Sequence, residues 1–204
     1  EMKARAPHEG YPLKVEVALV GSCTNSSYQD LARAASVARQ ALAKRIPMSA
    51  ELIINPGSEM IRATAERDGI LDDLRKVGGV IMTNACGPCI GQRKRHTDDN
   101  NRKNTIVTSF NRNFRRRADG NPNTYAFIGS PEMVVALAVA GRLDFNPATD
   151  KLQDADGNEV TLDEPRGEAF PPAGFIVSDG QKVGNVEQLE KESLFVPPHD
   201  DNEA

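Results

Sequence analysis

Short apolar runs and helical patterns follow one another along this chain in regular alternation, which leaves few folds open to it. Strands that alternate with helices are joined by crossover connections and therefore lie parallel in one sheet. The sequence thus predicts an α/β fold of three layers, a mainly parallel sheet with helices on both faces. The expected strands are Val15–Val20, Leu52–Ile54, Gly79–Met82, Thr105–Thr108 and Tyr125–Ile128.

Helical spacing of apolar residues predicts the elements between and after these strands. Ser26, Ser27 or Asp30 is suited to cap the first helix, and Gly69 stands where the second should end. Pro131 is expected at the first position of the last helix. The four helices are predicted over residues 31–42, 58–68, 70–77 and 131–140.

Composition divides the chain into three segments. Residues 1–14 hold two prolines and a glycine and are expected to form an irregular entry or linker. Residues 15–146 carry the strand and helix patterns and should form the α/β domain. Residues 147–204 begin with a hairpin that turns at Asp156-Gly157 and continue as an acidic, proline-rich arm or linker, too polar to build a core.

Bulk properties exclude several function classes. The chain of 204 residues has a net charge of −4, so we do not expect nucleic-acid binding. No run of about 18 apolar residues predicts a membrane span, and no secretory signal is visible. Three cysteines, an odd number, argue against a disulfide framework and leave thiolates for metal binding or catalysis. Charge is uneven, since residues 93–117 are basic and would suit an anionic ligand.

Three chemically interesting residues directly follow predicted strands. Cys23, Cys86 and Arg112 each lie where a strand ends. In parallel sheets the ligand site lies beyond the carboxyl ends of the strands. The predicted architecture therefore brings these residues, distant in sequence, to one edge of the sheet.

The two closely spaced cysteines leave several uses open. Cys86-Gly87-Pro88-Cys89 fits a redox pair, half of a zinc site or part of an iron–sulfur ligand set. Cys23 favours the third use, because three thiolates can hold a [4Fe–4S] cluster and leave one iron open as a Lewis acid. A small buried residue at a strand end is the plainer explanation of Cys23.

An arginine-rich segment adds a candidate anion site. Arg112 and Arg117 lie five residues apart after a predicted strand, and guanidinium groups grip carboxylates in a bidentate manner. Asn111 could donate its amide to a cluster sulfur or to a bound water. A solvated basic loop is the alternative interpretation.

Six blocks in register carry a resemblance to a known family. The chain resembles aconitases of the mitochondrial and related bacterial type, specifically their third domain, over about residues 15–146. The blocks are Gly21–Ser27, Asn55–Glu59, Ile61–Thr64, Asn84–Gln92, Asn104–Phe114 and Ser130–Glu132.

The resemblance implies a function and site residues. Aconitases interconvert citrate and isocitrate through cis-aconitate, and the three ligands of their [4Fe–4S] cluster match Cys23, Cys86 and Cys89. Asn111 matches an asparagine beside the cluster, whereas Arg112 and Arg117 match arginines that grip substrate carboxylates. A cluster with three cysteine ligands and an exposed iron is expected to be oxygen-labile and to lose that iron first, so an aerobic preparation can lack the cluster.

Other parts of the family pattern are absent from these 204 residues. The acid and base groups of the first two domains, and the catalytic serine of the C-terminal swivelling domain, have no counterpart here. The chain is therefore expected to be a fragment, inactive alone, whose partners are the remaining domains of the same polypeptide. Arg93, Lys94 and Arg95 also depart from the family, which has an aromatic residue after the position of Gln92.

Related readings stay open beside this one. A homoaconitase or isopropylmalate isomerase is the alternative within the superfamily. A C-G-P-C thiol oxidoreductase and an RNA-binding module are alternatives from other classes, the latter because some aconitases bind messenger RNA once the cluster is lost. The resemblance implies the bacterial cytoplasm or the mitochondrial matrix as the location.

Overall fold

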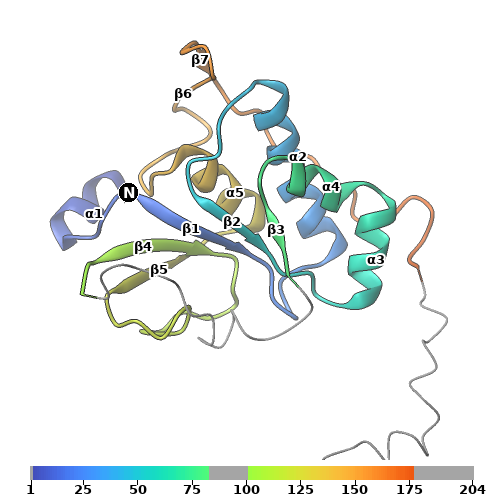
Figure 1. The fold of residues 1–204 in the computed structure, drawn as a ribbon, viewed down its shortest axis with the longest axis horizontal. Helices are drawn as coiled ribbons and strands as arrows, with labels where there is room; N and C mark the ends of the chain where they lie inside the picture. The colour runs from blue at the N-terminus through green and yellow to red at the C-terminus, as the bar shows by residue number, and fades with distance from the viewer. Residues whose placement is uncertain (1, 83–100, 177–204) are drawn as a thin grey trace, which may run out of the picture.

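A computed structural model describes residues 2–82 and 101–176 of the chain (Figure 1). Its centre is a five-stranded sheet in the order β3-β2-β1-β4-β5, with every neighbouring pair parallel. The parallel α/β class predicted from the sequence is confirmed. The strands are β1 (Val15–Val20), β2 (Glu51–Ile54), β3 (Val80–Ile81), β4 (Asn104–Thr108) and β5 (Thr124–Ile128).

Four helices pack on one face of this sheet and enclose the main core (Figure 1). Ala18 and Val20 of β1 point into this core, where they meet Leu31, Leu74 and other fully buried side chains. The larger of these side chains, those of Val20, Leu31 and Leu74, each stabilise the fold by roughly 1.5–3 kcal/mol when they leave water. The helices are α2 (Tyr28–Ala43), α3 (Glu59–Arg67), α4 (Ile70–Lys76) and α5 (Pro131–Ala140).

The opposite face of the sheet has a smaller core. Val17 and Leu19 alternate with the residues above and pack with Phe110 and Ala118, which come from the connection between β4 and β5. Within the described ranges this connection packs on that face, whereas the four helices listed above lie on the other. The connection contains Gly120 and Pro122, residues that favour turns over helix.

Local signals in the sequence locate the helix ends. Ser27 caps α2 by accepting from the backbone N–H of Asp30, whose side chain in turn accepts from the N–H of Ser27. This capping box satisfies two N–H groups that the first turn of a helix leaves without partners. Ser58 caps α3, and Gly69 adopts a left-handed conformation between α3 and α4.

The start of the chain differs from the sequence-based expectation. Residues Met2–Glu9 form an α-helix, α1, instead of an irregular entry. Ala6 is fully buried against the main core, so packing outweighs the proline and glycine signals that argued against regular structure.

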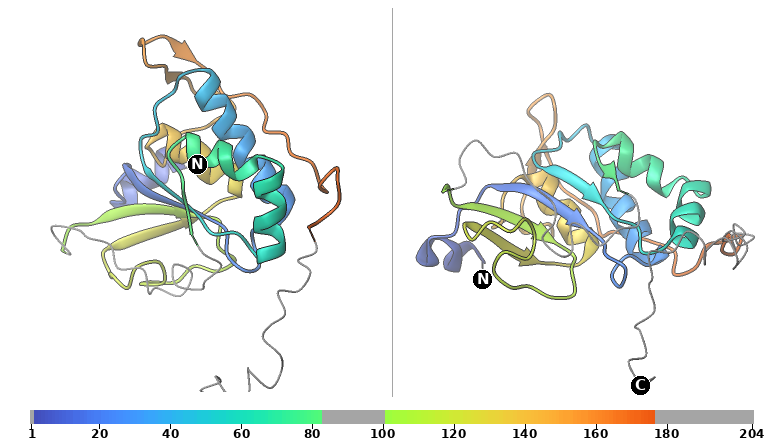
Figure 2. Two further views of the ribbon diagram at one scale, coloured as in Figure 1. Left: turned by 45° about the vertical axis from the view of Figure 1, so that its right-hand side comes forward. Right: turned by 60° about the horizontal axis from the view of Figure 1, so that its bottom comes forward.

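After α5 the chain forms the predicted hairpin, with β6 (Leu152–Gln153) antiparallel to β7 (Glu159–Val160). Residues 161–176, here named the strap, then run back along α2 towards α3 (Figure 2). One side chain from each of the later turns of α2 holds the strap. The backbone of the strap meets the side chains of Lys44, Gln40 and Ser36 in turn, and at its end those of Arg67 and Thr64.

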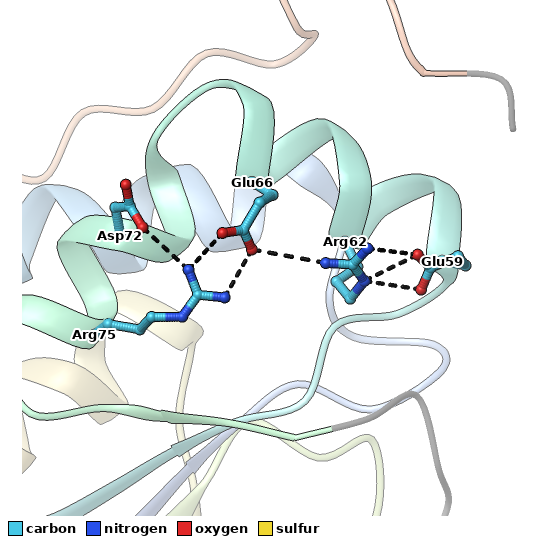
Figure 3. Close-up of polar contacts among 5 residues, drawn as sticks. All are labelled: Glu59, Arg62, Glu66, Asp72 and Arg75. Atoms are coloured by element: carbon cyan, nitrogen blue, oxygen red, sulfur yellow. Dashed lines mark hydrogen bonds and ion pairs between the residues drawn. The ribbon is translucent and has the colours of Figure 1, made fainter.

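Charged side chains join the two short helices on the outer surface (Figure 3). Arg62 pairs with Glu59 and Glu66, and Arg75 pairs with Glu66 and Asp72. This network fastens α4 to α3. Among the described residues, no helix is long and apolar enough to cross a membrane.

Candidate functional site

The strand order creates a natural ligand site where β1 and β4 lie side by side. From β1 the chain crosses to β2 on one side, whereas β4 and β5 extend the sheet on the other side. In open parallel sheets the crevice at such a switch point is where ligands bind. Two segments border it, the Cys23 turn (residues 21–25, after β1) and the arginine loop (residues 109–117, after β4), which leave the sheet at the same edge (Figure 1).

The Cys23 turn is held tightly at its base. Gly21 has φ +92°, and a Cβ atom there would lie 2.2 Å from the carbonyl oxygen of Asn55 at the end of β2. Ser22 is fully buried, and its carbonyl accepts a hydrogen bond from the N–H of Asn25 at 3.3 Å. Cys23 lies at the exposed tip. The plain reading of Cys23 as a small buried residue is therefore wrong.

In the arginine loop, Arg117 is engaged by the loop itself. Its side chain is only 9% exposed, and its guanidinium carbon lies 5.4 Å from the ring centroid of Phe110 and 5.6 Å from that of Phe114. The same guanidinium donates to the carbonyl oxygen of Arg112 and, at 3.1 Å, to Oδ1 of Asn111. These contacts give the loop its shape around one buried cation.

The bond to Asn111 fixes which end of its amide is presented. A guanidinium only donates, so the carbonyl oxygen of Asn111 must face Arg117. The amide nitrogen, with its two donors, is therefore on the opposite side of the side chain. Asn111 is exposed, as the prediction of an amide donor at this edge requires.

The two predicted anion-binding arginines differ in their surroundings. Arg112 is exposed, at the same edge of the sheet as the Cys23 turn. Arg117 is buried, with its guanidinium against the rings of Phe110 and Phe114. The alternative of a solvated basic loop describes Arg112, Arg115 and Arg116 but not Arg117. Sequence spacing alone treats Arg112 and Arg117 as equivalent.

Part of the predicted site lies outside the described residues. Cys86 and Cys89 fall in this category, as do Arg93, Lys94 and Arg95. Within residues 2–82 and 101–176 no three His, Cys, Asp or Glu side chains gather in a way that could hold a metal ion. The three-cysteine ligand set, and the use of Cys86 and Cys89 as a redox pair, remain predictions.

Sequence reasoning missed one residue that joins the two segments. Ser109 directly follows β4, as the first residue of the arginine loop, and is hydrogen-bonded to Gly21 and Asn25 of the Cys23 turn. A serine after a strand has no distinctive pattern, so its only signal was its position at the predicted ligand edge.

A separate cavity of about 360 Å³ lies beside β5 and α5. Its lining is largely apolar, with Met2, Phe127, Met133 and Leu137 among the contributors. The carboxylate in the lining, that of Asp144, is already paired with Arg142 at 2.7 Å. This cavity therefore lacks the convergent polar groups of a catalytic site.

The fold and the edge described above define a parallel α/β domain built to bind a ligand at its switch point. The family model described as the aconitase family (aconitate hydratase) matches residues 1–141. The chain belongs to the aconitase family.

Similar proteins agree with this assignment. The chain is 48% identical over 202 residues to the mitochondrial aconitate hydratase of Gracilaria gracilis, an alignment that covers 99% of the chain and 24% of the relative. It is 56% identical over 165 residues to a probable mitochondrial aconitate hydratase of Dictyostelium discoideum, an alignment that covers 81% of the chain and 21% of that relative. The mitochondrial aconitate hydratase of Saccharomyces cerevisiae is 52% identical over 175 residues, which cover 86% of the chain and 22% of that relative. The chain spans about a quarter of the length of these relatives.

Proposed function

We propose that this chain is the cluster-bearing third domain of an aconitate hydratase, a hydro-lyase that interconverts citrate and isocitrate through cis-aconitate. Residues 15–146 form that domain, residues 1–14 lead into it, and residues 147–204 connect it towards a swivelling domain. The proposal is supported most directly by the exposed Cys23 at the switch point, beside a loop that carries cationic side chains, in a member of the aconitase family.

In this proposal Cys23, Cys86 and Cys89 hold a [4Fe–4S] cluster. The fit of the described residues to such a group is good, because Cys23 is an exposed thiol on a rigid turn and soft thiolates are the usual ligands of iron–sulfur clusters. When bound, a cluster with three protein ligands supplies a Lewis-acidic iron. The alternative uses of this edge would not need Cys23.

The arginine loop binds the anionic substrate. Arg112, which is exposed, is placed to pair with a substrate carboxylate, because a guanidinium can bind both oxygens at once. Arg117, which is buried, adds its positive charge to the anion site and holds the loop in shape. Asn111 accepts from Arg117 through its carbonyl oxygen, so its amide donors would be available to a cluster sulfur or a bound water. These residues orient the substrate but supply no acid or base group.

Turnover therefore requires the remaining domains of the same polypeptide, and this chain alone is inactive in the proposal. The relatives are named as mitochondrial proteins, which supports a mitochondrial location, and the matrix is the compartment proposed. Citrate, isocitrate and cis-aconitate are the substrates, and homologous hydro-lyase reactions on related carboxylates are the alternative.

Iron and sulfide analysis of the full-length polypeptide tests the proposal. After anaerobic reconstitution the protein should be brown, with iron and acid-labile sulfide, and each of Cys23→Ser, Cys86→Ser and Cys89→Ser should abolish stable cluster retention. Thr24→Ala, on the same exposed turn, is the matched control and should retain the cluster. A colourless protein whose Cys86 and Cys89 cycle between dithiol and disulfide would instead establish the thiol oxidoreductase.

A further inference from the structure

Ser109, the first residue of the arginine loop after β4, is hydrogen-bonded to the Cys23 turn. We infer that Ser109 is a positioning residue that fixes the Cys23 thiol relative to Asn111 and Arg112. The inference rests on the proposed function, in which Cys23 ligates the cluster and the loop binds the substrate.

Every polar atom of Ser109 is bonded to the segment that presents Cys23. Its N–H donates to the carbonyl oxygen of Leu19 at 2.9 Å, which continues the pairing of β1 with β4 by one residue. Its hydroxyl accepts from the N–H of Gly21 at 2.7 Å. Its carbonyl oxygen accepts from the side-chain amide of Asn25 at 3.0 Å. The bonds to Gly21 and Asn25 span the turn from its beginning to its end, with Cys23 between them.

The hydrogen bond between the N–H of Gly21 and the hydroxyl of Ser109 is buried. Ser109 is 3% exposed and its bond to Gly21 is buried, so removal of the hydroxyl leaves the N–H of Gly21 away from water without that acceptor. On its other side Gly21 already lies against the end of β2, where a Cβ would be 2.2 Å from the carbonyl oxygen of Asn55. The turn therefore sits between two strand ends, and Ser109 defines its distance from β4.

Ser109 also sets the start of the arginine loop. The next residue, Phe110, is 3% exposed and forms the ring on which the Arg117 guanidinium rests. Arg117 in turn holds Asn111 and the backbone of Arg112. A shift of Ser109 would displace the thiol and the cationic loop relative to each other. Residues that orient metal ligands from outside typically change metal affinity by about 10–100-fold when they are mutated.

The test compares Ser109 with its neighbour Thr108 in the metal-free full-length polypeptide. Thr108→Val is the matched control, because Thr108 is 1% exposed and its hydroxyl accepts a hydrogen bond from the N–H of Phe110, at 3.5 Å, and not from the Cys23 turn within the described residues. Cobalt(II), followed by its thiolate charge-transfer absorption, is the probe of the cysteine site. Ser109→Ala should weaken cobalt affinity about tenfold relative to Thr108→Val, and Ser109→Thr, which keeps the hydroxyl, should restore it.

Further variants separate the possible failures. Asn25→Ala removes the bond to the Ser109 carbonyl without removing the buried hydroxyl, and it should lower cobalt affinity in the same direction even if Ser109→Ala folds poorly. Equal affinities for Ser109→Ala and Thr108→Val, with Cys23→Ser strongly weakened, would overturn the role of Ser109 and leave the proposed function standing. A Cys23→Ser protein that binds cobalt and iron like the unmodified protein would overturn both.

Discussion

The guanidinium of Arg75 on α4 donates to both carboxylate oxygens of Glu66 on α3, at 2.5 and 2.7 Å (Figure 3). These hydrogen bonds lower the pKa of Glu66, and partial burial opposes the shift without cancelling it. A carboxyl group whose pKa is lower in the folded than in the unfolded state stabilises the fold above its unfolded pKa. That contribution is lost as the pH falls through the folded value.

Glu66→Gln should therefore lower stability at neutral pH but not in acid. We expect a loss below about 1 kcal/mol, because the pair is partly exposed and solvent screens it. The difference between the two proteins should shrink as the pH drops below about 4, the ordinary range for Glu. Urea unfolding across this range measures it. Glu164→Gln, outside the network, is the control, and a difference that persists at low pH would contradict the linkage.

Gly21→Ala tests the close packing at the base of the Cys23 turn. A left-handed φ strains any side chain, and here the new Cβ also collides with a backbone oxygen. We expect a loss above about 3 kcal/mol in the free energy of unfolding. Gly69→Ala separates the two effects, since φ there is +73° with no atom within 4 Å. It should cost about 1–2 kcal/mol, and equal losses would exclude the collision.

Arg112→Ala and Arg117→Ala should differ in their effect on stability. Arg112 is exposed, so its replacement should change the free energy of unfolding by less than about 0.5 kcal/mol. Arg117 is buried with hydrogen bonds to the loop, and its loss should cost about 1–3 kcal/mol. Citrate binding to the full-length polypeptide should weaken in both. Unchanged citrate affinity in Arg112→Ala would exclude Arg112 from the anion site.

Gln40→Ala should loosen the strap at one turn of α2. The side chain of Gln40 donates to the carbonyl oxygen of Asp163 at 3.1 Å and accepts from its N–H at 2.7 Å. Hydrogen exchange of residues 163–166 should accelerate in the variant. Arg39→Ala is the control on the same helix, because Arg39 bonds Asp73 on α4 instead of the strap. Equal exchange in both variants would show that Gln40 does not hold the strap.

Much of this fold follows from local sequence signals. The β-branched run of β1 and the serine caps of α2 and α3 are short-range features, so pattern and capping chemistry predict them. The arrival of Cys23 and Arg112 at one edge follows from the parallel order of the strands. Helix α1 was missed because its stability comes from the burial of Ala6, a tertiary contact with no local signature.

The candidate site was only partly predictable for a similar reason. The sequence distinguishes Arg112 from Arg117 only through Phe110 and Phe114, whose rings meet the Arg117 guanidinium after the loop has folded. The role of Ser109 could not be predicted from the sequence, because its partner Gly21 is 88 residues away and meets it only where β1 and β4 pair in the fold.

The strap has a consequence for how this region tolerates change. Lys44, Gln40 and Ser36 meet it mainly through its main-chain atoms, which every residue type except proline supplies alike. Replacement of one strap side chain by another should therefore be neutral at most positions. Adding or deleting a single residue would instead shift the main-chain N–H and C=O groups of the strap away from their partners Lys44, Gln40 and Ser36 on α2.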